Sequence, residues 1–112
     1  MAKQPTKAER EHFAYVASQP CLVSGKRDVT LHHVTGYADR MGRFTRSHRL
    51  IVPLAKEFHQ AVWDNASDPQ SVEILSHRGF YEKHGIDLYH EALRLEENSM
   101  VAGRLPRRLE AA

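Results

Sequence analysis

Two adjacent histidines, His32 and His33, lie within a stretch of β-forming residues, and His59 follows about 25 positions later, near the start of an expected helix. Neighbouring side chains on a strand point to opposite faces, so these two imidazoles cannot have the same role. One imidazole can bind a divalent metal while its neighbour takes a proton from water, and the helix can supply further ligands. The spacing therefore indicates metal-assisted hydrolysis.

The chain has 8 histidines but only one cysteine, Cys21. The excess of histidine favours metal or proton chemistry. A single thiol excludes an intrachain disulfide and a cysteine-rich zinc finger, so any metal site must use histidine and carboxylate. Three further histidines have simpler interpretations: His12 as a surface residue, His84 as a residue at a helix C-terminus, and His90 as part of a solvated helix face.

Hydrophobic periodicity, capping residues and helix breakers predict the elements that must position these side chains. Helices are expected over 7–18 and 56–65, from Asp68-Pro69 onward and from Asp87, and strands over 21–23, 29–34 and 49–54. The helix over 56–65 would turn Phe58, Val62 and Trp63 inward. The order predicts an α+β fold in which a two-stranded hairpin and the helix after it are wrapped by further helices.

The length of 112 residues predicts a single domain over 1–112, with 1–5 and 99–112 as flexible ends and fraying from Asn98. Trp63, Phe80, Tyr81 and Tyr89 are expected in the core. The chain has no apolar run of the length that a membrane span needs, and its first residues lack the apolar region of a signal peptide. We therefore expect a soluble, intracellular protein with no membrane partner.

Charge is unevenly divided along the chain. Residues 26–56 carry a formal charge of +5, whereas residues 57–97 carry −6. The basic part includes a ladder at three-residue spacing in and beside the polar segment between the last two strands: Arg40, Arg43, Arg46 and Arg49. Arginine runs are often only solvated, but this basic part is where a polyanion would bind, and we expect these residues to contact the phosphates of DNA.

Several short motifs follow one another in a recognisable order between His12 and Glu97. They are Cys21-Leu22-Val23-Ser24, Leu31-His32-His33-Val34, Gly42-Arg43, Ile51-Val52-Pro53-Leu54-Ala55, Phe58-His59, and His77 leading into the stretch Phe80 to Asp87. In this order and spacing the chain resembles the phage and prophage HNH proteins related to the Ref recombination enhancement nuclease. That resemblance implies an HNH, or ββα-metal, hairpin-helix core.

The resemblance implies a role for each matching residue. His33 would be the general base that activates water, and His48 would orient it. His32, His59 and His77 would hold one divalent ion. Its identity stays open among Zn²⁺, Mg²⁺, Mn²⁺ and Ni²⁺. The family's second, structural zinc is not expected, because Ala55 and Phe58 stand where the family has ligands and Cys21 alone remains. Packing around Phe58 would take the place of that zinc.

The function that follows is a metal-dependent endonuclease that hydrolyses DNA with low sequence specificity, in the cytoplasm of a bacterial host or phage-infected cell. DNA would be held mainly through its phosphates, and recombination proteins are possible further partners. One alternative is a non-catalytic DNA-binding module on the same fold with a structural metal. Another is a small helical protein whose acidic C-terminal half binds a partner. The sequence leaves the oligomeric state open.

Overall fold

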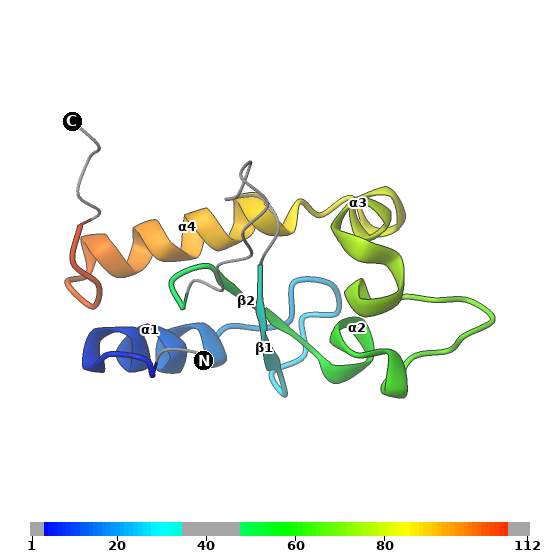
Figure 1. The fold of residues 1–112 in the computed structure, drawn as a ribbon, viewed down its shortest axis with the longest axis horizontal. Coiled ribbons are helices and arrows are strands. Elements are labelled where there is room, and N and C mark those ends of the chain that lie inside the picture. Colours follow the sequence, from blue (N-terminus) through cyan, green and yellow to red (C-terminus); the bar gives the residue numbers. More distant parts are fainter. Residues whose placement is uncertain (1–3, 35–47, 108–112) are drawn as a thin grey trace.

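The computed structural model describes residues 4–34 and 48–107. It is a small α+β fold in which a two-stranded antiparallel sheet lies among four helices (Figure 1). The elements, in chain order, are α1 (Lys7–Ala17), β1 (Thr30–His33), β2 (Ile51–Leu54), α2 (Lys56–His59), the 3₁₀ helix η1 (Ala61–Trp63), α3 (Val72–His84) and α4 (Leu88–Val101).

The hairpin pairs Thr30 with Leu54 and His33 with Ile51, so the adjacent histidines occupy the end of β1 at which β2 begins. β2 is the centre of the core, because all of its side chains are buried. Figure 1 shows the hairpin between two groups of helices, with α1 and α4 on one side and α2 and α3 on the other. The two groups of helices therefore cover different sides of the hairpin.

The long helices form where caps and apolar spacing agree. Thr6 and Glu9 make a complete capping box at the start of α1. Asp87 caps α4, as expected, and its side chain accepts the backbone N–H of His90. Leu88, Ala92 and Leu95 recur at helical spacing along α4 and are all buried. This apolar stripe holds α4 against β2.

Several sequence predictions about the elements are wrong. Residues 21–23 form a turn and not a strand, because the Cys21 carbonyl accepts the N–H of Gly25, whose positive φ of 74° closes the turn. The helix expected over 56–65 is α2 followed by η1, and Val62 and Trp63 are exposed. The fraying expected from Asn98 is also wrong, since α4 continues to Val101.

The start of α3 differs from the prediction as well. Asp68 does not cap a helix; Ser71 does, with its side chain accepting the N–H of Ile74. The carboxylate of Asp64 holds the chain before this cap by accepting the N–H groups of Gln70 and Ser71. A backbone already bound in this way cannot begin a helix at Asp68.

The C-terminal segment is packed as far as it is described. Leu105 is buried, Arg104 donates to the Ser99 hydroxyl and lies over the Tyr15 ring, and Arg107 pairs with Glu97. Of the expected core aromatics, Phe80 is fully buried and Tyr89 packs against the core, but Trp63 and Tyr81 are exposed. No helix in the described part of the chain is both long and apolar enough to cross a membrane.

Candidate metal and general-base site

Three imidazoles meet on the side of β1 that faces α2 and α3. His32 comes from β1, His59 from the end of α2 and His77 from α3. The His32 ring lies 5.0 Å from the His59 ring and 5.3 Å from the His77 ring, measured between centroids. The Nε2 atoms of His32 and His77 are 3.0 Å apart. The structure therefore brings together all three residues that the sequence assigns as metal ligands.

A threonine that sequence reasoning missed orients one of these rings. The hydroxyl of Thr30 donates to the Leu54 carbonyl, so the same oxygen must accept from Nδ1 of His59, 2.7 Å away. This bond places the His59 proton on Nδ1 and the lone pair on Nε2, which is the form a metal ligand requires. The signal was present in the sequence, because Thr30 and His32 are two apart on a strand and share a face.

The ionisation of His77 also suits a ligand. Burial lowers the pKa of His77, and the nearby carboxylate of Asp87 offsets this only in part. A lowered pKa keeps the imidazole neutral near pH 7, and only a neutral imidazole binds a metal.

The donor set fits a transition-metal ion, although its arrangement is not that of a loaded centre. Nitrogens that each lie about 2.0–2.1 Å from one Zn²⁺ are roughly 3 Å apart, close to the separation of the two Nε2 atoms. Within residues 4–34 and 48–107, no group of three or more His, Cys, Asp or Glu residues is arranged so that it could hold a metal ion as it stands. Binding at these three imidazoles therefore requires side-chain adjustment.

The other candidate pair lies on the α1 side of β1. Nε2 of His33 is 3.3 Å from Nδ1 of His48, and the Phe13 ring packs edge-on against both imidazoles. A bond between two imidazoles couples their tautomers, because one nitrogen must donate and the other accept. The structure thus brings together the residues assigned as general base and orienting partner, on the face of β1 opposite to His32.

The arginine ladder is described only at its last member. Arg40, Arg43 and Arg46 lie outside the described residues. Arg49 donates from Nε to the buried carboxylate of Glu96 at 2.6 Å and from NH2 to the Pro106 carbonyl at 2.7 Å. Its side chain is only 16% exposed. Arg49 is therefore held by the fold, in contrast to the expected contact with phosphate.

His12 is the clearest error of the sequence interpretation. It is fully buried and not a surface residue, with Nδ1 2.6 Å from the Ser99 hydroxyl and Nε2 3.0 Å from the Arg49 carbonyl. Its position four residues before the buried Val16 was the available signal. His12 thereby fixes the backbone next to His48.

The remaining histidines lie away from both clusters. His90 is exposed, as expected. His84 does not bond the carbonyls at its helix end; its Nε2 donates to the Gln70 carbonyl, and its ring contacts Phe58 and Phe80.

Cys21 is buried against Ala55 and Ser24. Burial raises the pKa of its thiol, but hydrogen bonds from the Ala55 backbone and from Ser24 outweigh burial and lower it. Phe58 packs against the same core. The turn that would present a cysteine ligand is therefore present, with apolar side chains around it.

One comparison with known proteins identifies a family. The family model described as "Protein of unknown function (DUF968)" matches residues 1–98, which is most of the chain. The chain therefore belongs to the DUF968 family. No curated protein and no solved structure matches it.

Proposed function

We propose that this member of the DUF968 family is a metal-dependent endonuclease of the HNH type that hydrolyses DNA phosphodiester bonds with low sequence specificity. The observation that carries the proposal is the cluster of His32 on the hairpin, His59 on the helix directly after it and His77 on α3. Its second support is the adjacent His33 with its partner His48. Both clusters depend on the last two residues of β1.

The proposed division of labour follows from the chemistry of each group. His32, His59 and His77 would hold one divalent ion, which would stabilise charge on the phosphate and on the leaving 3′ oxygen. His33 would take the proton from the attacking water, and His48 would fix its tautomer and orientation. Thr30 would keep His59 in the ligating tautomer through the bond to Nδ1.

A phosphate must reach both faces of β1 for these groups to act on it together. Among the described residues β1 pairs only with β2, so its other edge carries no strand. His33 is the last residue of β1, where the strand ends. We infer that the scissile phosphate lies across the end of β1, with the water on the His33 side.

The test is nicking of supercoiled plasmid DNA by the purified protein with Mg²⁺, Mn²⁺, Ni²⁺ or Zn²⁺, with EDTA as the stop. His33→Ala should lower the rate by about 10²- to 10⁴-fold, the usual contribution of a general base, while the metal content stays unchanged. His32→Ala and His77→Ala should lose both metal and activity. Val101→Ala is the control, because Val101 is exposed and lies outside both histidine clusters.

Undiminished nicking by His33→Ala would remove the assignment of the general base. DNA binding with bound metal but no nicking under any of these ions would favour the alternative, a DNA-binding module with a structural metal. Metal analysis adds an independent readout: one ion per chain that is lost in His32→Ala supports the ligand set, and two ions per chain contradict the replacement of the structural zinc by packing.

A further inference from the structure

We propose that a groove beside His77 binds one nucleobase of the DNA strand, and that it prefers a base carrying an exocyclic amino group. The inference rests on the proposed function for the presence of DNA, but it uses different residues. Two adjoining pockets, of about 340 and 260 Å³, share Tyr81 and Asp87 in their walls. The smaller one also includes His77 and Arg78, so the groove begins at the imidazole cluster.

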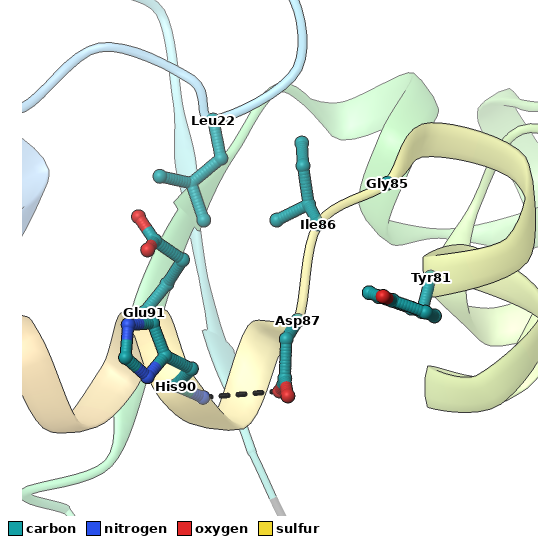
Figure 2. A pocket seen from close by; sticks show the side chains of 7 residues that line it. All are labelled: Leu22, Tyr81, Gly85, Ile86, Asp87, His90 and Glu91. Atoms are coloured by element: carbon teal, nitrogen blue, oxygen red, sulfur yellow. Dashed lines mark hydrogen bonds between the residues drawn. The ribbon is translucent and has the colours of Figure 1, made fainter.

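Tyr81 provides the flat surface that a base needs. Its side chain is 55% exposed, whereas its neighbour Phe80 is fully buried in the core. Figure 2 shows the Tyr81 ring on α3 opposite Asp87 at the start of α4, with Leu22 and Ile86 forming the apolar part of the wall. An exposed aromatic side chain beside an apolar wall can stack against any of the four bases.

The charges in the groove favour a base over a phosphate. Asp87 and Glu91 lie in the wall of the larger pocket, and carboxylates repel phosphate but accept hydrogen bonds from amino groups. Arg78 lies only in the smaller pocket, at the end near His77. Asp87 lies in the walls of both pockets and Arg78 is paired with Glu82, so the groove offers carboxylate acceptors along its length, with one cation near His77. A strand whose phosphate lies near His77 would place its next base between Tyr81 and Asp87.

The carboxylates also give the direction of base preference. Cytosine, adenine and guanine carry exocyclic amino groups that can donate to Asp87 or Glu91, and thymine carries none. Asp87 Oδ1 accepts the N–H of His90 at 3.1 Å, which fixes the carboxylate in place at the beginning of α4. A fixed acceptor discriminates better than a mobile one, because less freedom is lost on binding.

The experiment measures binding of fluorescently labelled short oligo-dC and oligo-dT to metal-loaded His33→Ala protein, in which cleavage is suppressed. Oligo-dC should bind more tightly than oligo-dT. Adding Tyr81→Ala should weaken oligo-dC binding by about five- to a hundredfold, the range expected for loss of one stacked base, while Tyr81→Phe should retain it. Asp87→Asn keeps a helix-capping side chain and should reduce the preference for oligo-dC, because an uncharged amide oxygen is a weaker acceptor than a carboxylate.

Trp63→Ala is the matched control, because Trp63 is also an exposed aromatic residue, at 53%, but lies outside both pockets. Three outcomes would each overturn the proposal that this groove binds a base. They are equal binding by Tyr81→Ala and the parent, equal losses of binding in Tyr81→Ala and Trp63→Ala, and no preference for oligo-dC in the parent. The nuclease proposal fails separately. If the wild-type protein does not nick DNA while binding still depends on Tyr81, only the enzymatic assignment is lost.

Discussion

His12 is a buried polar residue that connects distant parts of the chain. Its Nε2 must donate to the Arg49 carbonyl, since a carbonyl only accepts, and this leaves Nδ1 as the acceptor of the Ser99 hydroxyl proton. The bonds join α1 to α4 and to the residue that follows His48. A single imidazole therefore supports the backbone on which the candidate general-base pair depends.

The ionisation of His12 predicts an acid-sensitive fold. Burial lowers the pKa of His12, and this effect outweighs the bond to Arg49 and the charge of Glu96, which both raise the pKa. Between this lowered pKa and the ordinary value of 6.5, the unfolded chain binds more protons than the folded one. The contribution of neutral His12 to the free energy of unfolding should therefore be complete above about pH 6.5. It should decrease as the pH is lowered through this window. Urea unfolding at a series of pH values from 7.5 to 5 measures the slope.

His12→Gln identifies the source of that slope. The variant should lose about 1–3 kcal/mol at pH 7.5, because buried partners are left poorly satisfied. Its stability should change less between pH 7.5 and 5 than that of the wild-type protein, and the remaining slope should include His77, whose pKa is lowered in the same direction. A His12→Gln slope as steep as the wild-type slope would contradict this role.

Residue types predict part of the site and not all of it. The sequence groups His32, His59 and His77 separately from His33 and His48, and the structure places them in those two groups. Strand alternation accounts for the opposite faces of His32 and His33, because it depends only on position along the chain, whereas the grouping of the other three came from the family resemblance. His12 could not be identified in this way, since its burial depends on Ser99 and Arg49, which are far away in sequence.

At the scale of elements, α3 contains a sharp break directly before His77. Ser76 has φ 65° and ψ 174°, whereas the residues around it are helical. Essentially only glycine adopts this region without strain, and other residues there cost about 1–3 kcal/mol. The break changes the direction of the chain at the position that sends His77 toward His32. Strain in this helix therefore coincides with a candidate ligand.

Ser76→Gly should stabilise the protein. Removing the strain gains about 1–3 kcal/mol, and the greater freedom of glycine in the unfolded chain costs about 0.5–1 kcal/mol, so the net gain should be about 0–2.5 kcal/mol. Chemical denaturation measures this difference. Ser76→Ala is the matched control, because alanine has the same backbone restriction as serine and should give no gain. A Ser76→Gly protein less stable than Ser76→Ala would show that Ser76 is not strained.

Long elements are predictable from the sequence where local signals agree, and short ones are not. The Thr6–Glu9 capping box and the Asp87 cap predict the starts of α1 and α4 correctly. Residues 21–23 are apolar enough for a strand, but apolar character alone does not supply a partner strand. The break at Ser76 has no local signal, because serine does not favour this backbone conformation.

At the scale of the whole molecule, a buried ion pair joins the basic and acidic parts of the chain. Arg49 belongs to the basic part and Glu96 to the acidic part, and the Glu96 side chain is only 2% exposed. This pair ties the entry of β2 to α4. The charge division seen in the sequence therefore serves two purposes: Arg49 supports the fold, and Arg40, Arg43 and Arg46 remain the proposed contacts to phosphate.

This division predicts different outcomes for the arginines of one ladder. Arg49→Ala should destabilise the protein by about 3–5 kcal/mol, because it removes one partner of a buried ion pair. Replacing Arg40, Arg43 and Arg46 together by alanine should decrease the magnitude of the slope of log binding constant against log salt by about 0.9 for each lost contact to duplex phosphate. Arg94→Ala, which removes a more exposed pair with Glu91, should cost less than about 1 kcal/mol. An Arg49→Ala protein as stable as Arg94→Ala would show that the buried pair does not hold α4 to the hairpin. An unchanged salt slope in the variant lacking Arg40, Arg43 and Arg46 would remove these three arginines from the DNA interface.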